Sequence, residues 1–130
     1  MRTAGNAIRR GDVFDIALPC GDETVSCKVL VLQNDIANRV APTVIVTPLV
    51  EGVPDNLSVA VPVPASHAHG LGSDHLALLS QIYTLDKGIL TAGRRLAIVQ
   101  SQGMAAIDKA LQLSLGLGMF QKMTGRRRDN

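Results

Sequence analysis

The sequence predicts a mainly β (α+β) domain, built as a small, strongly curved barrel with appended helices. Short apolar runs rich in β-branched residues recur before residue 100 and are separated by Gly, Pro and Asp. Near residue 101 the apolar spacing changes from that of strands to that of a helix. The chain has 130 residues, which is the length of one domain and enough to bury a core without disulfide or metal staples.

Six apolar segments predict the strands of this barrel: residues 12–18, 27–32, 43–49, 56–63, 75–82 and 96–99. The second and third are continuous apolar runs, as strands buried on both faces tend to be. The fourth alternates, but Pro62 and Pro64 lack a hydrogen-bond donor, so this strand should lie at an edge of the sheet or end early. Turn-forming residues predict loops at 19–26 and 64–74 and a tight turn at 84–90.

The last predicted element is a helix within residues 101–117, where Met104, Ile107 and Leu111 follow helical spacing. Ser101 is the expected N-cap and Gly116 the expected stop. The domain organisation follows from these limits. We expect a flexible lead-in at residues 1–9, a barrel domain at 10–120 and a flexible basic tail at 121–130.

Composition limits the classes of function. Aromatic residues make up only 2% of the chain, namely Phe14, Tyr83 and Phe120, so the composition does not favour extensive stacking on nucleic-acid bases. The formal net charge is +2, but most basic residues lie at the two ends, and the stretch between Gly11 and Gln121 carries −4. Attraction to a polyanion would therefore come from the ends or from local patches.

Targeting signals are absent from the sequence given. It shows no signal-peptide pattern and no apolar run of membrane-spanning length, and Cys20 and Cys27 form no CxxC motif. A cytoplasmic protein with two thiols and no membrane partner is the expectation. A Cys20–Cys27 bridge across a hairpin is the alternative.

A polar corner separates the two continuous apolar runs. It contains Gln33, Asn34, Asp35, Asn38 and Arg39. Asn34 and Asp35 are good turn residues, which favours a structural role for these two in capping a hairpin. Arg39 is an isolated basic group in an acidic section, which favours a functional role.

Four stretches resemble the MazF/PemK family of toxin endoribonucleases, in order and at matching distances. They are "RRGDVF" at 9–14, "VLVLQNDIANRVAPTVIVTPL" at 29–49, "LLSQIYTLDKGIL" at 78–90 and "IDKALQLSLGL" at 107–117. The resemblance extends over nearly the whole chain, from Arg10 to Leu117, and its second and third stretches are specific to that family.

The resemblance implies an SH3-like curved barrel of antiparallel strands, of the CcdB/PemK type, with a C-terminal helix, assembled as a homodimer. It implies a hydrolase that cuts single-stranded RNA at a short sequence and needs neither metal nor cofactor. In that chemistry the 2′-hydroxyl of the RNA attacks the adjacent phosphate, which leaves a 2′,3′-cyclic phosphate and a 5′-hydroxyl. The implied partner is a small antitoxin protein whose acidic tail lies across the RNA groove.

The catalytic positions of the family are changed in this chain. The family has an Arg just before the first continuous strand and a Thr just after the second, and Cys27 and Val50 occupy these positions here. Because one lost donor of this kind costs about 10²–10³ in rate, the activity should be weak unless other groups have been recruited. Three replacements are considered: Lys28, if a bulge shifts the strand register; Cys27, as a thiolate base; and Glu23, where the family carries a loop acid.

The resemblance also places Gln33, Asn34, Arg39 and Tyr83 along the RNA groove. Tyr83 would either stack on a base or pack. His67, His69 and His75 lie in or beside one loop, where they are solvated, bind a metal or supply an acid–base pair. No metal site is expected.

Two other functions stay open. The first is a catalytically inactive PemK-like binding module for RNA, an antitoxin or a homologous toxin. The second, more remote, is a gyrase poison built on the same barrel, although no signature of that group is present at the C-terminus.

Overall fold

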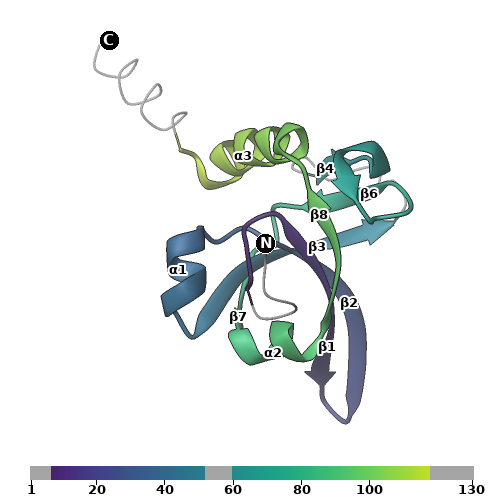
Figure 1. Cartoon of the computed structure of the whole chain (residues 1–130), viewed down its shortest axis with the longest axis vertical. Helices are drawn as coiled ribbons and strands as arrows, with labels where there is room; N and C mark the ends of the chain where they lie inside the picture. The colour runs from purple at the N-terminus through teal and green to yellow at the C-terminus, as the bar shows by residue number, and fades with distance from the viewer. Residues whose placement is uncertain (1–6, 52–59, 118–130) are drawn as a thin grey trace.

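The computed structural model describes residues 7–51 and 60–117 (Figure 1). The predictions for residues 1–6, for the first half of the segment 56–63 and for the tail 121–130 lie outside the described residues. The elements are β1 (Asp12–Cys20), β2 (Glu23–Val31), α1 (Asp35–Val40), β3 (Thr43–Glu51), β4 (Ala60–Val63), the 3-10 helix η1 (Ala65–His67), β5 (Ala68–His69), β6 (His75–Leu78), β7 (Tyr83–Asp86), α2 (Lys87–Ala92), β8 (Arg94–Val99) and α3 (Ser101–Leu115).

All the strands belong to one antiparallel sheet in the order β4-β6-β3-β2-β1-β8-β5, and β7 pairs with β3 off this path. β3 pairs with β2 along one side and with both β7 and β6 along the other, so the sheet bends sharply around it. Figure 1 shows the resulting curved barrel, with α1 at its flank, α2 below it and α3 across its top. The fold confirms the predicted SH3-like antiparallel barrel with a C-terminal helix, and β4, the strand with Pro62, is an edge strand as predicted. No helix in the described ranges is both long and apolar enough to cross a membrane.

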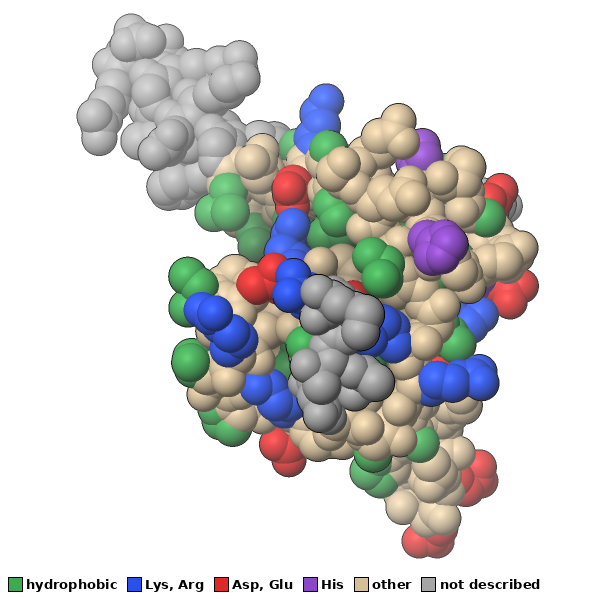
Figure 2. Space-filling view, in the orientation of Figure 1, with side chains coloured by type: hydrophobic (Ala, Val, Ile, Leu, Met, Phe, Trp, Pro, Cys, Tyr) green, Lys and Arg blue, Asp and Glu red, His purple; other side chains and the backbone are tan. Residues whose placement is uncertain are grey.

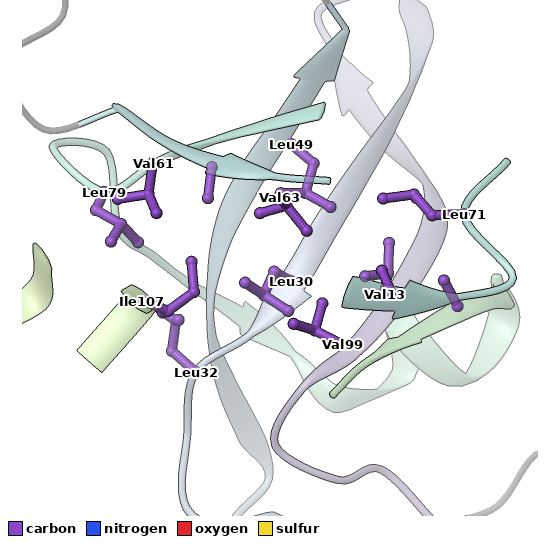
Figure 3. Close-up of a cluster of buried hydrophobic side chains, with 13 residues drawn as sticks. Val13, Leu30, Leu32, Leu49, Val61, Val63, Leu71, Leu79, Val99 and Ile107 are labelled. Atoms are coloured by element: carbon purple, nitrogen blue, oxygen red, sulfur yellow. The ribbon is translucent and has the colours of Figure 1, made fainter. Parts of the chain in front are cut away.

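Two hydrophobic cores lie on opposite faces of the central strands. Leu30 of β2 belongs to the first, together with Val13, Leu49 and Ile107 (Figure 3). Val29, the preceding residue of β2, belongs to the second. Because side chains alternate along a strand, neighbouring residues of β2 face different cores, which decides where the functional side chains point.

The loop predicted at residues 19–26 is wrong. β1 and β2 form a long hairpin whose last pair is Cys20 and Glu23, so only Gly21 and Asp22 form the turn. Gly21 has φ of +65°, and it occupies the first central position, which suits a two-residue type II′ turn. The hairpin end is exposed on both faces and lacks an apolar pattern, so the sequence did not reveal it.

Short helices replace other predicted turns. The corner at 33–42 contains α1 rather than a hairpin cap, and the turn predicted at 84–90 contains the end of β7 and most of α2. The loop at 64–74 contains η1 and β5. α3 has Gln100 rather than Ser101 at its N-cap, whereas Gly116 ends it in the left-handed conformation as predicted.

Candidate functional site

The register of β2 decides which residues can share a site. β1 and β2 pair without interruption from Val13 opposite Leu30 to Cys20 opposite Glu23. The bulge that would bring Lys28 to the face of Cys27 is therefore absent, so the condition under which Lys28 could take the place of the family's Arg on that face is not met. Lys28 faces the same side as Leu30 and the first core, while Cys27 packs against the second core.

The surroundings of Cys27 and Val50, the two residues that the resemblance places at catalytic positions, do not favour acid–base chemistry. Burial raises the pKa of the Cys27 thiol, and the nearby Asp15 carboxylate raises it further, so the thiol stays protonated at neutral pH. Val50 is half-buried in β3 and has no polar atom in its side chain. A free thiol is also present at Cys20, so the two cysteines are unbridged.

A polar cluster lies on the opposite face, at the edge of the first core. The Nζ atom of Lys28 is 2.9 Å from Nε2 of His75 and 3.5 Å from Oε1 of Glu51. β6 brings His75 directly opposite Glu51 of β3. Three residues from three parts of the sequence are thus joined by strand pairing.

Both ring nitrogens of His75 have polar partners, and the two contacts fit one tautomer of its ring. Its Nδ1 atom lies 3.0 Å from the Ser73 carbonyl oxygen, which can only accept, so Nδ1 carries a proton and donates it. The Lys28 ammonium can only donate, so Nε2 of His75 accepts. His75, which is 3% exposed, is thus held between the Ser73 carbonyl and Lys28, and orients the Lys28 ammonium.

The cluster opens into a pocket of about 340 Å3, which we call the Lys28 pocket. Asp15, Arg94 and the glycine-containing loop at residues 70–73 line it together with Lys28 and His75. Asp15 is the cross-strand partner of Lys28, and its Oδ1 atom accepts a hydrogen bond from the Ser26 hydroxyl. The pocket thus combines two cations, a carboxylate and a buried histidine.

Asp15, Glu51 and Arg94 were not singled out from the sequence. The one available signal was Asp15, a carboxylate that interrupts the apolar run of β1.

Hydrogen bonds among its own side chains and backbone hold the polar corner in place. The Gln33 side-chain amide is buried and donates to Asn38 Oδ1 and to the Thr43 carbonyl, while Asn38 donates back to the Gln33 carbonyl. Asn34 caps α1 by accepting from the Ala37 N–H. These contacts indicate a structural role for the side chains of Gln33, Asn34 and Asn38. Arg39 takes part in none of them and is exposed on α1.

The other predicted site residues lie apart from the Lys28 pocket. Glu23 begins β2, five positions before Lys28 and so roughly 17 Å along the strand. Tyr83 is half exposed, and its hydroxyl donates to Gln81 Oε1 at 3.4 Å. His67 and His69 lie in η1 and β5 and do not line the Lys28 pocket. Across residues 7–51 and 60–117, no group of three or more His, Cys, Asp or Glu side chains is placed to hold a metal ion.

Known proteins share both this sequence and this fold. Residues 9–115 match the family described as PemK-like, MazF-like toxin of type II toxin–antitoxin system. The endoribonuclease MazF of Staphylococcus epidermidis is 36% identical over 117 residues, covering 87% of this chain and 95% of the relative. The endoribonuclease EndoA of Bacillus subtilis (strain 168) is 37% identical over 114 residues, covering 85% and 96%.

Among solved structures, an endoribonuclease in complex with its cognate antitoxin from a mycobacterial species superposes with a TM-score of 0.66 at 27% identity, covering 86% of this chain and 96% of that one. The MazE–MazF structure (Form-III) from Deinococcus radiodurans has a TM-score of 0.70 at 19% identity, covering 86% and 99%, and supports the fold alone. The match over residues 9–115 and the identity to two endoribonucleases agree with the curved barrel. The chain therefore belongs to the PemK-like, MazF-like toxin family of type II toxin–antitoxin systems.

Proposed function

We propose that this protein is a metal-independent endoribonuclease that cuts single-stranded RNA at a short sequence, and that the Lys28 pocket supplies the groups that Cys27 and Val50 do not. The observation that carries the proposal is the Lys28 ammonium held at 2.9 Å from Nε2 of the buried His75. Glu51 accepts a second hydrogen of this ammonium at 3.5 Å. The third hydrogen remains for a phosphate oxygen in the pocket.

The reaction follows from the groups that face the pocket. The Asp15 carboxylate removes the proton of the 2′-hydroxyl, and the 2′ oxygen attacks the adjacent phosphorus. Lys28 and Arg94 offset the charge that develops on the phosphorane. The bond from phosphorus to the 5′ oxygen breaks, Lys28 protonates this leaving oxygen, and the proton held by Asp15 returns to Lys28, its cross-strand neighbour.

A small acidic antitoxin is the proposed protein partner, as in the mycobacterial relative that was solved with its cognate antitoxin. A homodimer is the proposed assembly. Exposed leucines at the end of α3, Leu113 and Leu115, and Leu117 beyond it offer apolar surface to a second copy. Light scattering should give twice the chain mass of 13.8 kDa, and a monomer at micromolar concentration would contradict the assembly.

A non-cleaving RNA-binding module is the second candidate. The observation that favours it is the chemistry of Cys27 and Val50. By the resemblance, these residues stand where the family has an Arg and a Thr, and they offer a protonated thiol and an apolar side chain instead. In that case the Lys28 pocket binds a phosphate of the RNA but does not catalyse cleavage.

The test is cleavage of a mixed-sequence single-stranded RNA in the presence of EDTA. The natural protein should cut at a defined motif and leave 2′,3′-cyclic phosphate ends, as read by mass spectrometry. Lys28→Ala should lower the rate by about 10²–10³. Lys109→Ala removes an exposed charge on α3 and should not change the rate.

His75 is a positioning residue, and its variants separate positioning from folding. His75→Gln keeps an acceptor for Lys28 and should retain most of the activity, whereas His75→Leu should lose it while remaining folded. If the natural protein does not cut but Cys27→Arg/Val50→Thr does, the binding module is the correct function. If Lys28→Ala cuts as fast as the natural protein, the Lys28 pocket is not the catalytic site.

A further inference from the structure

A second pocket, of about 520 Å3, lies between the segment before β1, helix α1 and the start of α2. We call it the α1 pocket. It shares no lining residue with the Lys28 pocket. Three cations line it, Arg9, Arg39 and Lys87, together with the Asp35 carboxylate and the apolar side chains of Ile8 and Ile36. Its volume falls within the range of pockets that hold small ligands.

The three cations of the α1 pocket lack partners within the described residues. Arg10, Lys28 and Arg95 each pair with a carboxylate, but the structure of residues 7–51 and 60–117 shows no ion pair or side-chain hydrogen bond for Arg9, Arg39 or Lys87. Figure 2 shows basic side chains gathered over α1 and below it, at the left of the view. Three like charges around one cavity repel one another, and an anion would relieve this repulsion.

The backbone that carries each cation is held in place. The Arg9 N–H donates to Asp12 Oδ2 at 2.9 Å, and the neighbouring Ile8 is buried in the second core. The Lys87 N–H donates to the Pro42 carbonyl at 2.9 Å. Arg39 follows Asn38, which is 2% exposed and bonded to Gln33. The backbone at each cation is therefore positioned before a ligand arrives, and only the side chains have to be ordered on binding.

Asp35 indicates which anion fits. Its described hydrogen bonds, from the Arg10 N–H at 2.7 Å and from Asn38 Nδ2 at 3.3 Å, both go to Oδ1, so Oδ2 can still accept from a ligand. A nucleotide has hydroxyl and amino hydrogens for this oxygen, as well as a phosphate for the cations. An acidic peptide side chain has only further negative charge to place beside Asp35. Ile36, 68% exposed, offers an apolar surface to a sugar or base.

We propose that the α1 pocket binds one nucleotide of the RNA strand, with its phosphate between Arg39, Lys87 and Arg9 and a hydroxyl or amino group on Asp35. The inference rests on the proposed function, because it takes RNA as the ligand. It deepens that function by adding a contact made entirely outside the Lys28 pocket, where a strand can be held without being cut.

The test uses a fluorescently labelled single-stranded 2′-deoxy oligonucleotide of mixed sequence, which lacks the attacking hydroxyl and so reports binding alone. Arg39→Gln and Lys87→Gln should each weaken binding by about three- to tenfold in low salt, as measured by fluorescence anisotropy. Lys109→Gln removes the same charge from the exposed face of α3 and should stay within about twofold of the natural protein. Adenosine 5′-monophosphate should displace the oligonucleotide at lower concentration than inorganic phosphate or a polyglutamate peptide.

Two results would overturn the inference: Arg39→Gln and Lys87→Gln binding as Lys109→Gln does, or polyglutamate competing better than the nucleotide. Its failure differs from failure of the proposed function. If the natural protein cuts RNA while both variants bind normally, only the α1 pocket is wrong. If the natural protein cuts no RNA while both variants lose binding, the pocket stands and the catalytic proposal fails.

Discussion

Cys27 lies on β2, opposite Ile16 of β1, with its side chain against the second core. This environment disfavours a charged thiolate, because burial removes water from the sulfur and Asp15 adds a like charge nearby. The position at which the resemblance predicts an Arg thus holds a group whose neutral form is favoured. Both effects disfavour a Cys27 thiolate as the base at neutral pH.

The raised pKa of Cys27 can be measured in a Cys20→Ser variant. Alkylation by iodoacetamide should accelerate at a higher pH in the folded protein than in the same protein in urea, because only the thiolate reacts. The linked effect on stability has a definite sign. The folded state keeps the proton longer, so the free energy of unfolding should fall as pH rises past the pKa of the unfolded thiol. Equal midpoints in the folded and unfolded protein would show that burial does not protect the sulfur.

Asn38 makes a second residue-scale prediction. It is 2% exposed, donates to the Gln33 carbonyl and accepts from the Gln33 amide, so Asn38→Ala leaves buried polar groups without partners. We expect a loss of about 2–3 kcal/mol in the free energy of unfolding in urea. Asn34→Ala removes only the exposed N-cap of α1 and should cost about 1 kcal/mol. Equal losses would mean that the buried amide pair does not hold the corner.

At the scale of elements, the loop at residues 70–73 forms one wall of the Lys28 pocket. Gly70 has φ of +99°, and a Cβ placed on it would lie 2.6 Å from the Leu96 carbonyl oxygen. Gly72 has φ of +68°, but a Cβ there meets nothing within 4 Å. Substituting each glycine by alanine therefore separates two contributions to the free energy of unfolding: the left-handed backbone, which both share, and a steric clash, which only Gly70 has.

Gly72→Ala should lower the free energy of unfolding by about 1–2 kcal/mol, the cost of placing a side chain in the left-handed region. Gly70→Ala should cost at least about 1 kcal/mol more, because the loop must also move away from β8. Gly70→Ala should slow RNA cleavage as well, since the displaced loop carries the Ser73 carbonyl that orients His75. Urea unfolding and the cleavage assay measure these effects. A Gly70→Ala protein as stable as Gly72→Ala would place the loop farther from β8 than described.

Elements with a strong local signal were predictable from the sequence. The buried runs of β2 and β3 and the amphipathic α3 were found because their apolar spacing is regular over many residues. α1 and α2 were missed because each has six residues, too few to be stable alone. Contacts distant in sequence hold them, such as the bond from the Lys87 N–H to the Pro42 carbonyl.

The candidate site was less predictable than the fold. Lys28 and His75 were both noted in the sequence, but their contact spans 47 residues and depends on β6 pairing with β3 rather than with another strand. No local pattern encodes that choice. The prediction that Cys27 and Val50 stand where the resemblance places an Arg and a Thr needed only the sequence, because both are counted without a gap from the neighbouring motif residues.

At the scale of the whole molecule, Arg10 joins three parts of the fold. Its backbone N–H donates to Asp35 at the start of α1, its Nε donates to the Leu32 carbonyl at 2.8 Å, and its Nη2 pairs with Asp108 of α3. The ion pair to α3 is largely exposed, since the Arg10 and Asp108 side chains are 28% and 52% accessible. The bond to Leu32 is part-buried. These contacts should therefore contribute unequally to holding the molecule together.

Asp108→Ala should lower the free energy of unfolding by less than about 1 kcal/mol, because an exposed ion pair is weak and is screened by salt. Arg10→Ala should cost about 1–2 kcal/mol more, because it also removes the donor from the Leu32 carbonyl, while the backbone bond to Asp35 survives. Urea unfolding of both single variants and the double variant gives the coupling of the pair directly. If Asp108→Ala costs as much as Arg10→Ala, the ion pair to α3 is the contact that matters. In that case, packing of Ile107 and its neighbours would not be sufficient to hold α3 on the barrel.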